Sequence, residues 1–199
     1  MFEEKRSRYE RSLVRQGNTA YAAGLALLMA GDGRAGGWLR RAAARWRESW
    51  DAGAAPDAWG RPVGALKASL LAGDDAAVDE LARWTLELGT ATADSPIGRY
   101  AAVLALLALR RQPEAGHVAP ALRREDFPRD VADALAAIAG GDADAYAGAV
   151  ASVVHSFETR GDFLEDVPVA DTALVLDLLA RRCGVVRALP ESSVLPAVV

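Results

Sequence analysis

Residues that commonly bind metals or form disulfides are scarce in this sequence. Cys183 is the only cysteine among 199 residues, which excludes an intramolecular disulfide and a thiolate-rich zinc site and favours a reducing compartment. The two histidines, His117 and His155, fall in different predicted helical pairs and do not form the paired Glu-x-x-His elements of a di-iron bundle. A Walker-type glycine-rich loop, a Gly-x-Ser-x-Gly elbow and a His-Glu-x-x-His sequence are all missing. We therefore predict a protein without cofactor, metal or enzymatic activity.

Long apolar runs are also missing. The longest uninterrupted nonpolar stretch, Tyr100 to Leu109, is half the length of a membrane span. The first residues, Met1 to Arg6, lack the apolar core of a signal peptide. Together with the single cysteine, these absences predict a cytoplasmic protein with no membrane partner.

Charge is distributed unevenly along the chain. The formal net charge is −4, but residues 1–50 carry ten Lys and Arg against five Asp and Glu, a net charge of +5. The remaining residues carry 13 basic against 22 acidic side chains, a net charge of −9. Because nucleic-acid affinity comes largely from basic side chains that neutralise phosphates, this acidic body argues against a nucleic-acid partner and leaves a basic protein partner open.

The apolar residues that are present favour helices. They make up 51% of the chain and are mostly Ala and Leu, which have high helix propensity. The octet from Tyr21 to Leu28 recurs from Tyr100 to Leu107, 79 residues later. Between these copies, Leu70-Leu71-Ala72-Gly73-Asp74 repeats the ending Leu28-Met29-Ala30-Gly31-Asp32 at an offset of 42. This spacing predicts an all-α fold made of an irregular array of antiparallel helical hairpins, similar to tetratricopeptide repeats or an α-solenoid.

One continuous domain is expected over residues 1–199. An N-terminal helix over 1–17 ends at Gly17-Asn18, helical hairpins follow over 18–160, and a closing helix with an extended tail occupies 161–199. Start and stop signals place the helices at 19–30, 34–50, 61–72, 75–88, 96–111, 128–139, about 143–159 and 168–183, with a short or irregular helix at 114–124. Disorder is expected only in 190–199.

The helix over 34–50 concentrates tryptophan and arginine. Trp38, Trp46 and Trp50 share one sector of it, and its edge carries three arginines: Arg34, Arg41 and Arg45. One interpretation is a groove of aromatic and guanidinium groups for an acidic peptide or stacked bases. The other, which we favour, is a tryptophan stripe facing the core, with outward-pointing arginines and an Arg45–Glu48 pair.

A dense acidic group follows His155 and consists of Glu158, Asp162, Glu165, Asp166 and Asp171. The candidate partner-binding residues there are Glu158, Asp162, Glu165 and Asp166. Carboxylates of this kind suit a hard cation, which would make His155 and Glu158 part of a metal-dependent enzyme. We favour a solvated acidic loop, with a protein interface as the second interpretation. The neighbouring stripe of Tyr146, Val150, Val153 and Phe157 predicts one buried helix face.

The C-terminal residues resemble the end of the immunity protein 49 family, helical antidotes associated with bacterial polymorphic toxins. The resemblance rests on the apolar helix over 170–180, its ending Arg181-Arg182-Cys183-Gly184-Val185-Val186, and the tail Ser193-Val194-Leu195-Pro196. Cys183 interrupts the basic-Gly pair of that family, and Val194 stands where an aromatic residue often precedes Leu-Pro. The resemblance implies neutralisation of a toxin by direct binding and assigns no site residues.

Two classes of function follow from these observations. The leading hypothesis is a non-enzymatic protein-binding module, an immunity protein whose acidic body covers the functional surface of a toxin. The alternative is a general helical-repeat scaffold that recruits a peptide or protein through the tryptophan and arginine helix. A metal-dependent enzyme is a third and weaker hypothesis.

Overall fold

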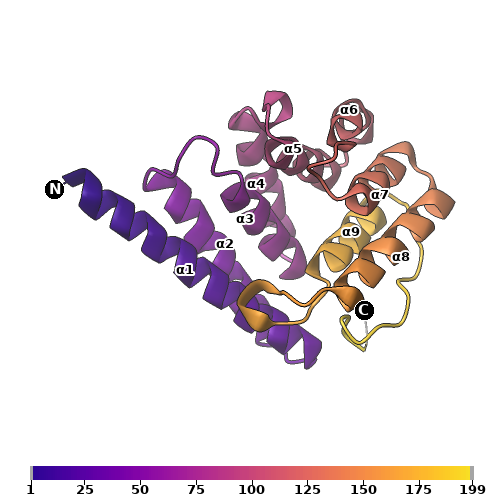
Figure 1. The fold of residues 1–199 in the computed structure, drawn as a ribbon, viewed down its shortest axis with the longest axis horizontal. Helices are drawn as coiled ribbons and strands as arrows, with labels where there is room; N and C mark the ends of the chain where they lie inside the picture. Colours follow the sequence, from indigo (N-terminus) through magenta and orange to yellow (C-terminus); the bar gives the residue numbers. More distant parts are fainter. Residues whose placement is uncertain (1, 198–199) are drawn as a thin grey trace.

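Helix-forming residues dominate the sequence, and the computed structural model, which describes residues 2–197, is helical with no strand over that range (Figure 1). The α-helices are α1 (Phe2–Met29), α2 (Ala35–Asp51), α3 (Gly60–Leu71), α4 (Asp75–Glu87), α5 (Pro96–Ala108), α6 (Gln112–Val118), α7 (Arg129–Gly140), α8 (Ala143–Thr159) and α9 (Asp171–Arg182). Short 3-10 turns are η1 (Thr90–Thr92), η2 (Ala119–Leu122) and η3 (Leu164–Asp166). The all-α prediction is confirmed.

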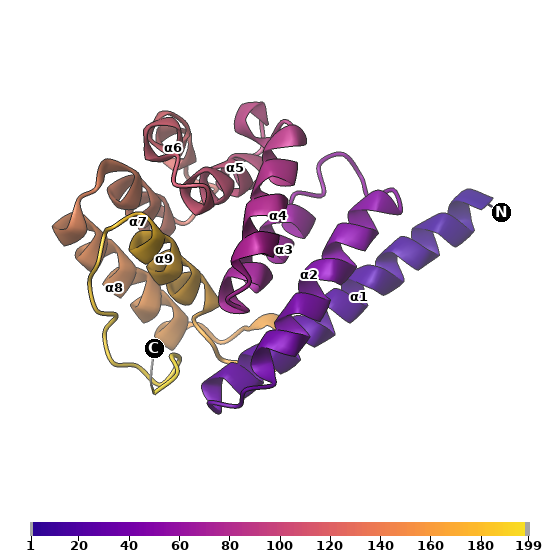
Figure 2. The ribbon, with the colours of Figure 1, turned by 180° about the vertical axis from the view of Figure 1, so that it is seen from behind.

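The helices are arranged in three groups, one at each end of the molecule and one between them. The long α1–α2 hairpin lies at one end, α7, α8 and α9 lie at the other, and α3, α4 and α5 connect them (Figure 1). The segment around η3 crosses back from the α8 end to contact α1. The C-terminal tail runs over the surface of α8 and α9, as seen from behind in Figure 2.

The predicted break at Gly17-Asn18 is wrong, because α1 continues through it to Met29. Both residues serve the contact with α2 instead. A Cβ atom built on Gly17 would lie 2.7 Å from Nε1 of Trp46, so only glycine lets the indole lie this close. Asn18 Oδ1 accepts a hydrogen bond from Trp46 Nε1 at 3.3 Å. The first two predicted helices are therefore one.

The tryptophan stripe of α2 is only partly in the core. Trp46 is 6% exposed and sits between Gly17 of α1 and Gly64 of α3, with its ring centroid 5.2 Å from that of Tyr21. Trp50 is half-buried and stacks on Trp59 with ring centroids 5.7 Å apart. Trp38, in contrast, is 39% exposed, so the prediction of a wholly core-facing stripe is wrong at this position.

The turns predicted from Gly-Asp pairs are present. Gly73 and Gly141 have positive φ angles of 67° and 70°, and the aspartate after each glycine accepts a backbone hydrogen bond that opens the next helix. Ser95 likewise caps α5 by accepting from the Ile97 backbone N–H at 3.2 Å.

The helix expected over 114–124 is short and irregular as predicted, since α6 ends at Val118 and η2 follows. Helix α5 ends at Ala108, three residues before the predicted end at Arg111.

The buried face predicted for α8 is confirmed, because Tyr146, Val150, Val153 and Phe157 are all buried.

Helix α9 begins at Asp171, three residues after the start predicted at Pro168. The Ala170 N–H donates to the Val194 carbonyl at 2.8 Å, so the tail holds residues 168–170 outside the helix. Val194 and Leu195 are buried, so the disorder expected in 190–199 is wrong for 190–197, while Val198 and Val199 lie outside the described residues.

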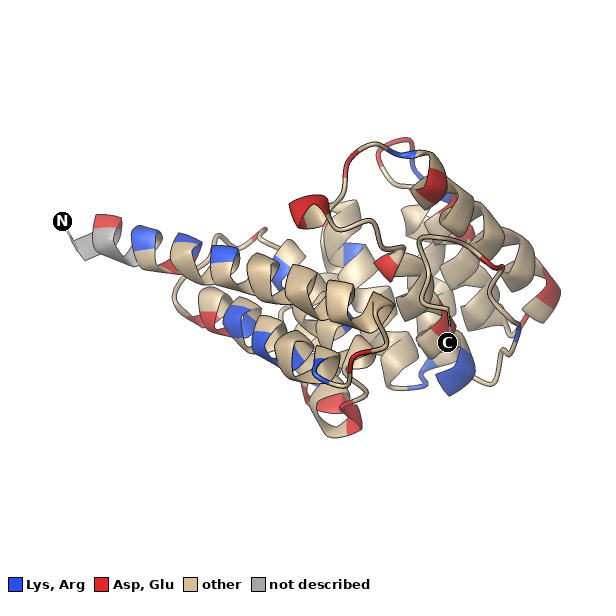
Figure 3. Ribbon diagram, turned by 90° about the horizontal axis from the view of Figure 1, so that it is seen from below, with Lys and Arg blue, Asp and Glu red and all other residues tan. Residues whose placement is uncertain are grey.

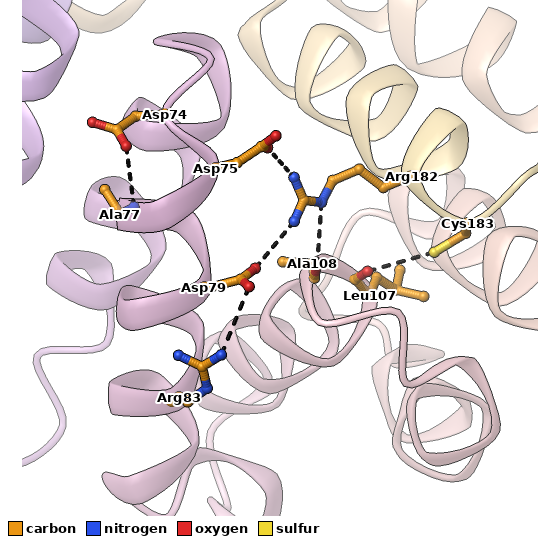
Figure 4. Close-up of polar contacts among 9 residues, drawn as sticks. All are labelled: Asp74, Asp75, Ala77, Asp79, Arg83, Leu107, Ala108, Arg182 and Cys183. Carbon is orange, nitrogen blue, oxygen red and sulfur yellow. Dashed lines mark hydrogen bonds and ion pairs between the residues drawn. The ribbon is translucent and has the colours of Figure 1, made fainter.

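Arg182, near the end of α9, joins three helices (Figure 4). Its guanidinium pairs with Asp75 and, at 3.1 Å, with Asp79 of α4, and its Nε donates to the Ala108 carbonyl of α5 at 3.2 Å. The adjacent Cys183 thiol donates to the Leu107 carbonyl at 3.5 Å. Burial raises the pKa of the Cys183 thiol despite two nearby arginines, so this cysteine is a packed structural residue.

Candidate functional site

A groove of about 340 Å³ lies between α1 and α2. Its lining residues are Ser12, Arg15, Gln16, Thr19, Ala20, Trp38 and Arg41. The Arg41 guanidinium carbon lies 5.6 Å from the Trp38 ring centroid, a cation–π distance, and the ring remains 39% exposed. The groove therefore combines an accessible indole with two guanidinium groups and no carboxylate.

The continuity of α1 creates one wall of this groove. Ser12, Arg15 and Thr19 are three and four residues apart, so they share one face of an unbroken helix. A helix that ended at Gly17 would not place Thr19 in line with Arg15. Sequence reasoning identified Trp38 and Arg41 but missed the α1 wall, because Gly17-Asn18 was interpreted as a helix end.

Two of the three predicted arginines do not line the groove. Arg34 pairs with Asp32 at 2.7 Å, and its hydrogen bonds lower the pKa of the Asp32 carboxyl to about 2. Arg45 pairs with Glu48 at 2.5 Å, which confirms the predicted pair. The same Glu48 accepts from the Tyr9 hydroxyl at 2.5 Å, and these bonds lower the Glu48 pKa. The charges of Arg34 and Arg45 are thus neutralised locally.

Unpaired positive charge remains on the α1–α2 hairpin. Arg15, Arg40 and Arg41 have no carboxylate partner among the residues whose side chains the structure describes. Lys and Arg positions follow one another along both helices in the view from below, whereas Asp and Glu predominate on the rest of the chain (Figure 3). Because Arg15, Arg40 and Arg41 are exposed, the basic N-terminal part of the sequence places unpaired guanidinium groups on the surface of the α1–α2 hairpin.

The four predicted acidic residues are not brought together. Glu158, on α8, accepts from the Ser192 hydroxyl at 2.7 Å and lies 3.5 Å from His155 Nδ1, so it anchors the tail. Asp162, Glu165 and Asp166 are exposed on the segment around η3. These three residues are close to Glu158 in sequence, but they do not share its contact with the tail.

The η3 segment has an unusual backbone. Glu165 and Asp166 have positive φ angles of 51° and 57°, a region that costs energy for residues with a side chain. Phe163 packs against Phe157 with ring centroids 6.3 Å apart and anchors the segment to α8. Leu164 is 43% exposed, so the segment presents an apolar side chain among carboxylates that have no ion-pair partner in the described chain.

Among the described residues, no group of three or more His, Cys, Asp or Glu side chains is arranged to hold a metal ion. In the same part of the chain, no helix is long and apolar enough to cross a membrane.

Asp171, predicted to belong to the solvated acidic group, instead forms a largely buried ion pair that joins distant helices. Lys67 Nζ of α3 lies 2.7 Å from Asp171 Oδ2 of α9, and the Tyr21 hydroxyl of α1 donates to the same oxygen at 2.8 Å. Lys67 also donates to Thr172 Oγ1 at 3.1 Å. Tyr100 of α5 lies close enough for both charges to act on its pKa, although burial is the main cause of its increase.

The electrostatics of this pair favour the charged forms. Desolvation acts to raise the Asp171 pKa, but Lys67 and the hydrogen bonds from Lys67 and Tyr21 outweigh it and leave that pKa lowered. Desolvation likewise opposes charging of Lys67, yet attraction to Asp171 leaves the Lys67 pKa raised. Lys67 is therefore a charged structural residue and not a neutral nucleophile.

A second buried carboxyl, Asp177 of α9, is less well paired. Its side chain is 1% exposed and bonds Arg181 through Oδ2 at 2.7 Å, but Oδ1 has no hydrogen-bond partner, and neither has the nearby buried Tyr146 hydroxyl. Desolvation raises the Asp177 pKa, with Arg181 acting in the opposite direction. Ionised Asp177 therefore costs stability at neutral pH.

Asp177→Asn is expected to raise the free energy of unfolding at pH 7 by up to about 1 kcal/mol. Because the folded pKa lies above the unfolded value, the protonated carboxyl contributes stability below about pH 4, and this is lost as the pH rises through the folded pKa. The gain of the variant should thus disappear in acid. Urea denaturation at pH 7 and pH 3 measures the difference in free energy of unfolding between the variant and the wild type. A variant that is less stable than the wild type at pH 7 would contradict the prediction.

Comparison with protein-family models, with curated proteins and with solved structures gives no match. The immunity protein 49 resemblance therefore stays a prediction from the C-terminal residues. The exposed groups of the α1–α2 groove and of the η3 segment are the features of the structure that bear on function.

Proposed function

We propose that this chain is a protein-binding module that neutralises a cognate bacterial toxin by direct contact. The observation that carries the proposal is Trp38, a large aromatic side chain left 39% exposed beside the unpaired Arg41. Tryptophan and arginine are the residues most enriched at the energetic centres of protein interfaces. Burying the indole of Trp38 against a partner would recover hydrophobic free energy that the isolated chain leaves unused.

The surroundings of α1 support an interface with both signs of charge. Besides its groove with α2, α1 contacts the η3 segment, where Leu164 is exposed among Asp162, Glu165 and Asp166. Charges of both signs near apolar side chains would steer one partner into one orientation and exclude others. The consecutive helical hairpins are proposed to act as the units of a tetratricopeptide-like array that holds these surfaces in place.

A general peptide-binding scaffold is the second candidate function. It is favoured by the groove itself, which is open, lies between two helices and is lined by side chains that suit an extended segment. The two candidates differ in what depends on binding. An antidote must suppress toxicity, whereas a scaffold need only capture its partner.

The test is co-expression of this chain with the toxin encoded beside its gene. We expect growth to be restored and the two proteins to co-purify as one complex on size-exclusion chromatography. A double variant, Trp38→Ala with Leu164→Ala, should lower the affinity about tenfold or more, since each apolar anchor contributes over about 1 kcal/mol. Unchanged killing without any complex would overturn the antidote proposal, and a complex without protection would favour the scaffold.

A further inference from the structure

We propose that the α1–α2 groove binds an acidic segment of the partner protein, with its carboxylates on Arg15 and Arg41 and an apolar side chain on Trp38. The inference rests on the proposed protein-binding function and names the chemistry that this surface recognises. It reverses the expected polarity, in which the acidic body of the chain was to cover a basic partner.

The first support is the charge of the groove. Arg15 comes from α1 and Arg41 from α2, so the two guanidinium groups face the groove from different helices. No carboxylate is among the lining residues, and neither arginine has a carboxylate partner in the described chain. A guanidinium binds a carboxylate through two parallel N–H···O bonds, which makes an acidic side chain the best-matched occupant.

The second support is the contrast with the other arginines of the hairpin. Arg34 and Arg45 are paired with Asp32 and Glu48 at 2.7 Å and 2.5 Å. The chain therefore supplies carboxylates to Arg34 and Arg45, whereas the groove arginines Arg15 and Arg41, like the neighbouring Arg40, are left without one. The Ser12 hydroxyl, the Gln16 amide and the Thr19 hydroxyl add neutral groups that can bond the backbone of an extended peptide.

The exposed indole explains why the occupant also carries an apolar side chain. Arg41 covers part of the Trp38 ring at 5.6 Å, which holds the guanidinium in place while leaving ring surface accessible. An acidic segment without an apolar residue would leave that surface in water. A segment with carboxylates on both sides of one apolar residue would contact both guanidinium groups and the indole ring.

A nucleic acid is the competing occupant for an aromatic and basic groove, and the charge of the whole chain disfavours it. Only two guanidinium groups line the groove, and the net charge of the protein is −4. Nucleic-acid affinity comes largely from several basic side chains that neutralise successive phosphates, and two guanidinium groups supply few such contacts. A short acidic protein segment with two carboxylates needs only these two.

The experiment measures fluorescence anisotropy of a labelled synthetic peptide of glutamates with one central leucine. A matched peptide with lysine for glutamate and a single-stranded oligothymidylate are the comparison probes. We expect only the glutamate peptide to bind the wild-type chain, with an affinity that falls as salt is added. Tighter binding of the oligothymidylate, or equal binding of the lysine peptide, would overturn the proposal.

Arg41→Glu and Arg40→Glu form a matched pair of variants. Arg40 is exposed, adjacent and equally without a carboxylate partner, but it does not line the groove. Arg41→Glu should weaken peptide binding about tenfold or more, and Arg40→Glu less than about threefold, because of these two residues Arg41 alone lines the groove. Equal losses would show that general positive charge, not the groove, holds the peptide.

Both positions are exposed, so neither substitution should disturb the fold. Circular dichroism of the two variants checks this. Co-expression with the toxin separates this inference from the proposed function. If Arg41→Glu neutralises the toxin as well as wild type, the groove assignment fails and the antidote function stands. If the wild type binds the glutamate peptide but gives no protection, the groove assignment stands and the antidote function fails.

Discussion

Asp171→Asn is expected to lower the free energy of unfolding by about 3 to 5 kcal/mol at pH 7, because it leaves the charged Lys67 buried without its partner. Asp171 accepts from Lys67 at 2.7 Å and from Tyr21 at 2.8 Å, so the substitution weakens contacts among three helices at once. Both ionic side chains are less than one-fifth exposed, which limits the ability of water to compensate. Urea denaturation followed by circular dichroism measures the loss.

The pH dependence of that loss has a defined sign. The folded pKa of Asp171 is lowered, so its contribution is present above the unfolded carboxyl value near 4 and is lost as the pH falls through the folded pKa. The Lys67 pKa is raised, so its contribution is complete below about pH 10 and is lost as the pH rises through the folded value. The effect of Asp171→Asn should be flat from about pH 5 to 9 and shrink in acid.

Asp162→Asn is the matched control, because Asp162 is exposed and has no ion-pair partner in the described chain. It should change the free energy of unfolding by less than about 0.5 kcal/mol. The double variant Lys67→Met with Asp171→Leu should be more stable than Asp171→Asn, because it removes both charges. A loss of less than about 1 kcal/mol in Asp171→Asn would contradict a buried pair.

Trp46→Ala is expected to cost about 3 to 5 kcal/mol, since it removes a large side chain that is 6% exposed and leaves a cavity. The cavity would lie between Gly17 and Gly64, whose missing side chains cannot fill it. The loss also removes the indole N–H that bonds Asn18 at 3.3 Å. Thermal and urea denaturation should both show a marked decrease in stability.

Trp38→Ala is the comparison within the same helix. Its indole is 39% exposed, and it should therefore cost less than about 1 kcal/mol. The two tryptophans thus separate folding from binding, because Trp46→Ala lowers stability while Trp38→Ala lowers partner affinity. Equal losses of stability would contradict the different burial of the two rings.

Local signals predicted the helices well, and contacts between distant residues were not predictable from them. Gly73-Asp74 and Gly141-Asp142 mark turns because glycine and aspartate act on their immediate neighbours. Gly17 has the same sequence appearance, but its role is to make room for Trp46, which lies in another helix. A single sequence does not distinguish a glycine that ends a helix from a glycine that lets a side chain of another helix pack closely against it.

The candidate site shows the same limit of local signals. Arg41 is near Trp38 in sequence, whereas Arg15 lies on another helix, so no local signal connects it to them. Arg34 and Arg45 resemble Arg41 in sequence, and only their pairing with Asp32 and Glu48 in the structure distinguishes them. The recurrence of Tyr21 and Tyr100 was interpreted as a repeat, and the structure places both tyrosines beside the Lys67–Asp171 pair.

The bond between Tyr21 and Asp171 also sets an order of events during synthesis. The two residues are 150 positions apart, so at about 5 to 20 residues per second the ribosome adds Asp171 roughly 8 to 30 s after Tyr21. From its own addition to the chain until α9 is made, Lys67 has no carboxylate from that helix. A nascent chain can form the α1–α2 hairpin early, but the bonds from Tyr21 and Lys67 to Asp171 form only when the last helix emerges. Chains released before α9 should consequently be short-lived in the cell.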